Sequence, residues 1–93
     1  METDEEIRIN KELLKQFEKS FIRLNIHDNK NIVSPYIMVT IRSSILTKYT
    51  SIKLNRIFND WILWEIDKLE SGLLNYYFKI YIEDIKNKLG EDD

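Results

Sequence analysis

Apolar side chains recur at helical spacing near the start of the chain. Ile7, Leu14, Phe17, Phe21 and Leu24 stand three, four or seven residues apart. That spacing places them on one face of an α-helix, with charged and polar residues on the other face. The pattern predicts an amphipathic helix over about residues 4–25, followed by a polar loop at 27–31.

Two further helices are expected in the middle of the chain. Ser34–Pro35 is typical of a helix start, and the stripe Met38, Ile41, Ile45 and Leu46 predicts a helix over 35–48. Ser51 is a candidate cap for the next helix, which is apolar around much of its circumference and extends over 52–70. A bend or break is expected near Asn59–Asp60.

The last segment fits two patterns. As a strand, it places Leu74, Tyr76, Phe78, Ile80 and Ile82 on one face. As a helix, it has the stripe Leu74, Tyr77, Phe78, Tyr81, Ile82, Ile85 and Leu89. The helical stripe runs further, and no turn signal for a return strand occurs before Gly90. We therefore expect a helix over 73–89, with strand as the alternative for 73–82.

These elements predict an all-α fold, a single domain over residues 1–93 with four helices. The stretch IRSSILTKYTSIKLNRIFNDWILWEIDKLESGLL, residues 41–74, resembles the helix-turn-helix core of winged-helix proteins. IRSSIL matches the first helix, SIKLNRIF the second and ILWEIDKLESGLL the third. The resemblance implies a helix-turn-helix arrangement of the middle helices, with a winged helix as the alternative fold.

Composition and charge limit the kinds of site and the cellular location that we expect. The chain has 93 residues, no cysteine and a net charge of −2. Disulfides and thiolate metal sites are therefore excluded. No apolar run approaches a membrane span and the N-terminus lacks an apolar signal core, so we expect a cytoplasmic protein without a membrane partner. Residues 29–59 carry five bases and no acid, which indicates a local attraction for phosphate or, alternatively, a chance distribution of surface charge.

Catalytic chemistry has little support. His27 is the only histidine and lies in a polar loop, where a solvated side chain is the simple interpretation. No glycine-rich phosphate loop, zinc motif or nucleophile arrangement is present. We expect neither a catalytic residue nor a metal ligand nor a cofactor, and hence not an enzyme.

The central bases supply one candidate DNA site. If residues 35–48 position a recognition helix that begins at Ser51, its N-terminal end carries Lys53, Asn55 and Arg56. Arg42, Lys48 and Tyr49 then flank it near the phosphate backbone. The alternative is that these seven side chains form the solvent face of two helices.

The aromatic residues supply candidate contacts of other kinds. Trp61 and Trp64 stand three apart, as core residues or as anchors of a protein interface. Four aromatic residues near the end of the chain could stack on single-stranded bases, although core packing is the alternative for them: Tyr76, Tyr77, Phe78 and Tyr81.

We expect a non-catalytic accessory subunit of a nucleic-acid-processing assembly. The alternative is a helix-turn-helix DNA-binding regulator that uses residues 42–56. The Ile-, Lys-, Tyr- and Asn-rich stretch KYTSIKLNRIFNDWILWEIDKLE is similar in style to proteins of thermophilic crenarchaea and their viruses. In size and predicted helical character the chain resembles the small accessory subunit of the crenarchaeal family-B replicative DNA polymerase holoenzyme. That resemblance implies a larger protein partner and a DNA polymerase holoenzyme; a homodimer and direct DNA contact remain open.

Overall fold

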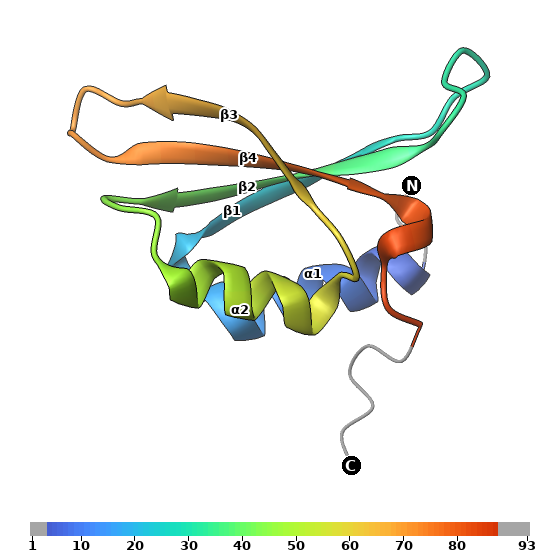
Figure 1. The fold of residues 1–93 in the computed structure, drawn as a ribbon, viewed down its shortest axis with the longest axis horizontal. Coiled ribbons are helices and arrows are strands. Elements are labelled where there is room, and N and C mark those ends of the chain that lie inside the picture. The colour runs from blue at the N-terminus through green and yellow to red at the C-terminus, as the bar shows by residue number, and fades with distance from the viewer. Residues whose placement is uncertain (1–3, 88–93) are drawn as a thin grey trace.

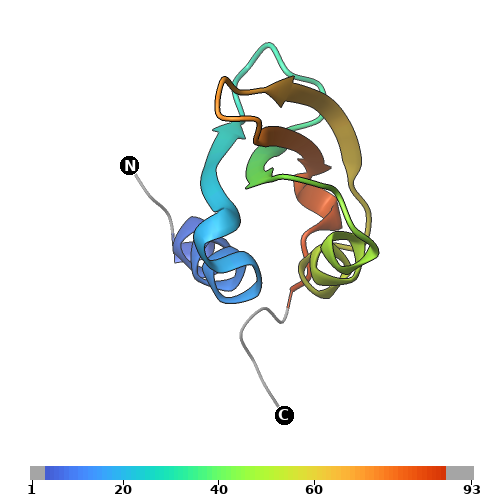
Figure 2. The same cartoon turned by 90° about the vertical axis from the view of Figure 1, so that its left-hand side faces the viewer.

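A four-stranded antiparallel sheet, covered on one face by two α-helices, forms the body of the protein (Figures 1 and 2). The computed structural model describes residues 4–87. The elements, in chain order, are α1 (Asp4–Phe17), β1 (Phe21–His27), β2 (Tyr36–Ser43), α2 (Lys48–Ile57), β3 (Ile62–Lys68) and β4 (Leu74–Tyr81), with short 3₁₀ turns at Glu18–Ser20 and Ile82–Asp84. The all-α prediction is therefore wrong, and the protein is α/β.

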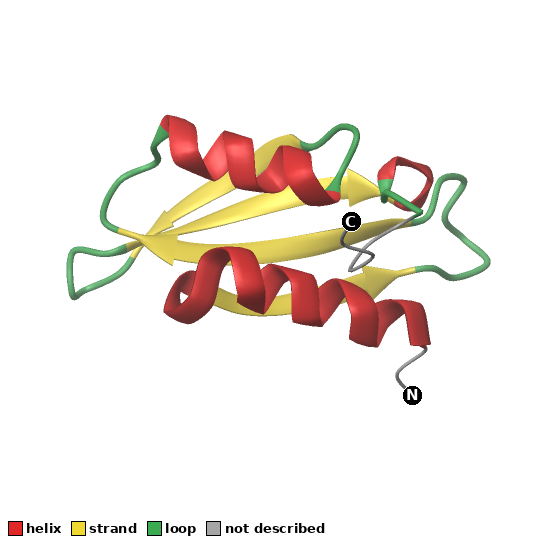
Figure 3. Cartoon of the chain, turned by 90° about the horizontal axis from the view of Figure 1, so that it is seen from below, coloured by secondary structure: helices red, strands yellow, loops and turns green. Residues whose placement is uncertain are grey.

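The sheet is built from two similar halves. Its strand order is β1-β2-β4-β3, so each half consists of one helix followed by a hairpin, and the two halves join along the antiparallel pair β2–β4. The end of each helix also contributes a Leu-x-x-x-Phe pair to the core: Leu13 with Phe17 in α1, and Leu54 with Phe58, the residue directly after α2. Seen from the helix side, α1 and α2 run along the strands beside each other (Figure 3).

Residues 35–48 form a strand and a loop instead of the predicted helix. β2 contains Ile37, Val39, Thr40 and Ile41, whose β-branched side chains lose rotamer freedom in a helix and fit a pleated surface. Ile37, Val39 and Ile41 alternate toward the core, and both edges of β2 are paired with other strands. Pairing on both sides of β2 and burial of one of its faces thus favour a strand over the predicted helix.

The first predicted helix is too long. α1 ends at Phe17, and Glu18 adopts a positive φ of 53° that turns the chain into β1. Phe21 and Leu24, which extend the helical stripe in the sequence, lie on β1 and pack against the core through sheet pairing with β2. The apolar spacing of this segment fits a long helix as well as a helix followed by a strand. The turn at Glu18 divides it into α1 and β1.

The predicted helix over 52–70 is divided into α2 and β3. α2 ends at Ile57, close to Asn59–Asp60, where a bend or break was expected, and the chain continues as a strand from Ile62. β3 is an edge strand, paired only with β4. The third helix of the helix-turn-helix match, ILWEIDKLESGLL, is therefore a β-hairpin strand and its turn.

The final segment is a strand, so the alternation over 74–80 was the correct pattern and the helix over 73–89 is wrong. Gly72, with φ of 92°, turns β3 into β4, and Leu69 donates its N–H to the Leu73 carbonyl across that turn. Residues 88 and 89 of the predicted helix lie outside the described residues. With residues 35–48 in a strand and two α-helices in the described chain, the helix-turn-helix and winged-helix predictions are both wrong.

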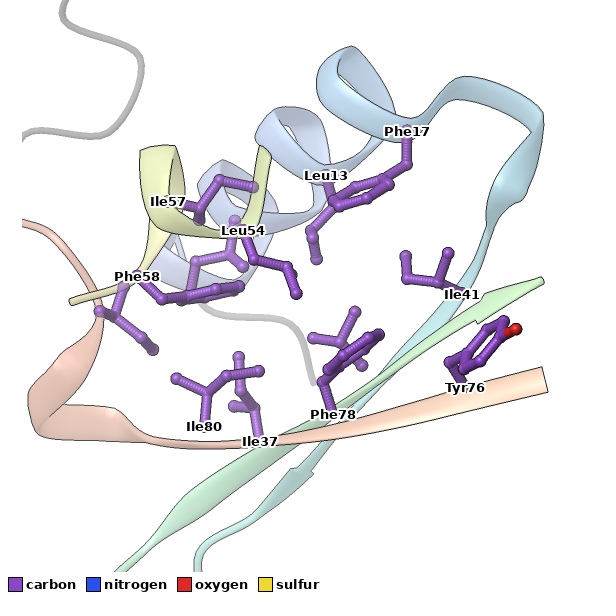
Figure 4. Close-up of a cluster of buried hydrophobic side chains, with 13 residues drawn as sticks. Leu13, Phe17, Ile37, Ile41, Leu54, Ile57, Phe58, Tyr76, Phe78 and Ile80 are labelled. Atoms are coloured by element: carbon purple, nitrogen blue, oxygen red, sulfur yellow. The ribbon is translucent and has the colours of Figure 1, made fainter. Parts of the chain in front are cut away.

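The hydrophobic core lies between the helices and the inner face of the sheet (Figure 4). Leu13 and Phe17 of α1 and Leu54 and Ile57 of α2 face the central strands. The largest buried side chains are Phe58, Phe78, Leu13, Ile37, Leu54, Ile57 and Ile80. Because the helices bury only this face, no helix or strand of residues 4–87 covers the opposite face of the sheet (Figure 2).

Candidate functional site

The uncovered sheet face, called here the open face, is the most distinctive surface of the described chain. Its residues are those that alternate with the core positions on each strand. They are Arg23, Asn25 and His27 on β1; Tyr36, Met38, Thr40 and Arg42 on β2; Asn75, Tyr77, Lys79 and Tyr81 on β4; and Ile62, Trp64, Glu65 and Asp67 on β3. Five of them carry rings and three carry a permanent positive charge.

Lys79 lies at the centre of the aromatic part of the open face. Its ammonium nitrogen is 4.3 Å from the ring centre of Tyr36, 4.8 Å from that of Trp64 and 5.2 Å from that of Tyr81. The three rings come from three different strands, β2, β3 and β4. A cation within about 6 Å of an aromatic ring is attracted by the ring's quadrupole, so Lys79 holds the cluster together.

One other ring, that of His27, extends this aromatic cluster. His27 stacks on Tyr36 with ring centres 4.7 Å apart and planes 13° apart. Trp64 remains 59% exposed although it contacts Lys79. A large aromatic side chain that is exposed and fixed in place is well suited to stacking against a flat ligand. The aromatic cluster, defined as His27, Tyr36, Trp64, Lys79 and Tyr81, therefore presents planar surfaces beside a cation.

The other half of the open face is polar. Arg42 donates from Nε to Asn75 Oδ1 at 2.9 Å, and Asn75 in turn donates to the Tyr77 hydroxyl at 3.5 Å. Across β1, Arg23 lies opposite Thr40, and its side chain makes no hydrogen bond or ion pair with any residue of 4–87. The guanidinium groups of this half are thus available to an anion.

Charge is distributed unevenly over the open face. Arg23, Arg42 and Lys79 form no ion pair within the described part of the chain. Two carboxylates, those of Glu65 and Asp67, stand on edge strand β3. A bound anionic chain is therefore favoured over β1, β2 and β4 and disfavoured along β3.

Both edges of the sheet are protected from pairing with another strand. β1 is irregular between Phe21 and Arg23, and β3 is irregular between Leu63 and Glu65. Bulges of this kind twist an edge strand and interrupt its row of free hydrogen-bonding groups. The face of the sheet, more than its edges, is thus the surface available for binding.

The predicted nucleic-acid residues are not brought together. Arg42 lies on the open face, whereas Lys48, Tyr49, Ser51, Lys53, Asn55 and Arg56 lie on α2, in the helix layer. Lys53 places its ammonium 5.7 Å from the Phe17 ring centre, and Arg56 donates to Gln16 Oε1 at 2.9 Å. These two cations are turned toward α1.

Asn55 also has a structural role. Its Oδ1 accepts a hydrogen bond from Trp61 Nε1 at 2.8 Å, and its carbonyl accepts one from Lys86. Trp61 packs edge-on against Phe78 with ring centres 5.4 Å apart. Trp61 is therefore a border residue of the core, while Trp64, three residues later, belongs to the open face. A helical spacing had placed both on one surface.

Sequence reasoning missed His27, Tyr36, Lys79 and Arg23 as candidate binding residues. The signal was present in the alternation of β4, where every second residue between Asn75 and Tyr81 is polar or aromatic, and more weakly in that of β2, where Tyr36, Thr40 and Arg42 alternate with apolar residues. Tyr77 and Tyr81, considered for base stacking, do lie on the open face. Tyr76 and Phe78, considered with them, are buried in the core.

A hollow continues the aromatic end of the open face. It has a volume of about 390 Å³ and is lined by Val33, Ser34, Pro35, Tyr81, Ile82 and Glu83. Within residues 4–87, acidic and histidine side chains nowhere gather in threes as a metal site would need. Neither helix of that part has the length and hydropathy of a membrane span.

Comparison with protein-family models, curated proteins and solved structures finds no match to this chain. The chemistry of the open face therefore carries the functional interpretation.

Proposed function

We propose that the protein is a non-catalytic accessory protein that binds single-stranded nucleic acid on its open face. The observation that carries this proposal is the aromatic cluster, in which Lys79 lies within 5.2 Å of three ring centres on an uncovered sheet. Single strands are bound by aromatic side chains that stack on bases and by cations that contact the backbone. Both elements occur here side by side.

The shape of the face also favours a single strand over a duplex. Bases of a duplex are stacked on each other and do not offer their faces to a flat sheet, whereas bases of a single strand can be splayed out. From Asn75 to Tyr81 the face extends over six residue steps of β4, about 20 Å at the usual rise per residue. A single-stranded nucleic acid that follows this length places at most about six nucleotides on the face, at a rise of about 3.4 Å per stacked nucleotide.

The proposal is tested by fluorescence anisotropy with labelled oligothymidylate, oligouridylate and a duplex of the same length. We expect both single strands to bind more tightly than the duplex at low salt. The variant Trp64→Ala removes an exposed ring and is expected to weaken binding to single strands. Absence of binding to either single strand at low salt, with the folded protein verified by circular dichroism, would refute the proposal.

A second candidate function, docking of this accessory protein on a larger protein, is favoured by a separate observation. Four apolar side chains are exposed in the loop before α2 and on its first turns, namely Ile45, Leu46, Tyr49 and Ile52. Tyr49 is 62% exposed and Ile45 64%. Anchors of this kind stabilise protein interfaces. The variant Tyr49→Glu tests it: a stoichiometric complex purified from native cells should be lost, while binding to single strands stays unchanged.

A further inference from the structure

The hydroxyl group of Thr40 is buried in the middle of the open face and has no hydrogen-bond partner in the described chain. Thr40 is 1% exposed, and its Oγ1 is without a partner. A buried polar atom without a partner lowers stability, and such atoms are rare in native proteins. Violations of this rule are expected mainly at functional sites.

Two arginines flank Thr40. Arg23 lies directly opposite it on β1, and Arg42 follows two residues later on β2, so both point to the same face. The Nε of Arg42 is used by Asn75, which fixes the guanidinium and leaves its terminal nitrogens available. Arg23 has no partner among residues 4–87, so its side chain is free to rotate away from Thr40.

We infer that Arg23, Thr40 and Arg42 form an anchor for one phosphodiester group of a bound single strand. Guanidinium groups are strong donors to phosphate oxygens, and the Thr40 hydroxyl supplies a third donor that otherwise has no acceptor. Thr40 lies between Arg23 on β1 and Tyr77 on β4, so movement of these neighbouring side chains would expose the hydroxyl as the phosphate enters. This inference rests on the proposed function, because it assigns the phosphate contact to the face that also stacks bases.

The position of the anchor agrees with the aromatic cluster. Arg42 lies opposite Asn75, four residues before Lys79 on the same strand. That separation is about 13 Å along β4. A single-stranded nucleic acid that is held both at the anchor and at Lys79 therefore places at most about four nucleotides between them, at a rise of about 3.4 Å per stacked nucleotide.

The anchor is tested with Thr40→Val, which keeps the shape of the side chain and removes the hydroxyl. We expect an unchanged or higher melting temperature, because no hydrogen bond is lost in the free protein. We expect a loss of affinity for oligothymidylate of about 10- to 150-fold, the size of one hydrogen bond to a charged group. Thr40→Ser keeps the hydroxyl and is the matched control, with affinity close to that of the original protein.

An abasic oligodeoxynucleotide separates the anchor from base stacking. It has phosphodiester groups and no bases, so Thr40→Val should weaken its binding while Trp64→Ala should not. Equal affinity of Thr40→Val and the original protein for the abasic strand would overturn the anchor. A lower melting temperature of Thr40→Val would also overturn it, since the hydroxyl would then have a partner in the free protein.

The two proposals fail in different ways. If oligothymidylate binds and Thr40→Val has no effect, the anchor is wrong and the proposed function stands. If oligothymidylate binds no better than the abasic strand, and Thr40→Val weakens both, the anchor stands and base stacking is wrong. If neither strand binds at low salt, both proposals are wrong.

Discussion

The ammonium group of Lys79 lies 4.8 Å from the centre of the Trp64 ring on the neighbouring strand. Trp64 occupies the irregular position of β3, between Leu63 and Glu65, where the regular alternation of faces is interrupted. The irregularity therefore brings an indole ring onto the open face next to the central cation. An edge strand that carries two carboxylates on the same face thus still contributes a stacking surface.

Replacing Trp64 by alanine should weaken single-strand binding and leave the fold intact. One stacked base contributes about 1–3 kcal/mol, so affinity should fall between about fivefold and about 150-fold. The side chain is 59% exposed, so the melting temperature should change little. Fluorescence anisotropy and thermal unfolding measure the two effects.

Trp61→Ala is the matched control. Trp61 packs on Phe78 and donates to Asn55, so its loss should lower stability while the open face keeps its rings. If Trp61→Ala weakened binding at a temperature where it is fully folded, and Trp64→Ala did not, the assignment of the two tryptophans would be wrong.

Salt should weaken binding in proportion to the number of phosphate groups that the open face contacts. One phosphate at the anchor of Arg23 and Arg42 and a second at Lys79 give a slope of log affinity against log salt of about −1.4, using about −0.7 per phosphate for single strands. The double variant Arg23→Ala with Arg42→Ala should reduce the slope by about 0.7. A titration series at several salt concentrations measures this slope. An unchanged slope in the double variant would exclude the anchor from the phosphate path.

The basic residues of α2 should contribute little. Lys53 and Arg56 are turned toward Phe17 and Gln16 of α1, away from the open face. We therefore expect the double variant Lys53→Ala with Arg56→Ala to keep its affinity for single strands within about twofold, apart from the general effect of charge. Loss of most of the affinity in this double variant, compared with Arg23→Ala, would move the binding surface to the helix layer.

Gly72 should be needed for the turn between β3 and β4. Its φ of 92° is unfavourable for residues with a Cβ, although a Cβ there would meet no atom within 4 Å. Gly72→Ala should therefore lower the free energy of unfolding by about 1–2 kcal/mol through the backbone alone. Chemical denaturation measures this. Glu70→Ala, at an exposed position of the same turn, should have almost no effect.

The apolar spacing near the start of the chain identified only part of the core. Phe17 lies on the predicted stripe and is buried at the end of α1, whereas Ile7 and Leu14 of the same stripe are exposed. Phe21 and Leu24 fit the same spacing but lie on β1, because the stripe continues across the boundary between a helix and a strand. A turn that depends on a positive φ at Glu18, a residue with no turn preference, gives no clear signal in the sequence.

The candidate site was harder to predict than the core. Arg42 was identified from the sequence and lies on the open face, and Trp64 was identified as a possible contact. Lys79 was not identified as a candidate, because its relation to Tyr36 and Trp64 depends on the pairing of three strands. Contacts between strands that are far apart in the sequence depend on the register of the sheet. A helical interpretation of the same segments predicts no sheet and therefore none of these contacts.

The antiparallel pair β2–β4 has a consequence for how the chain folds. Each helix-and-hairpin half forms from neighbouring segments, but β2 and β4 join residues as far apart as Tyr36 and Tyr81. Closing such a long loop costs entropy before its contacts form, and slow steps in folding commonly have this origin. We expect the two halves to gain structure early and their union along β2–β4 to limit the folding rate. The binding face, which crosses that junction, then exists only after the last step.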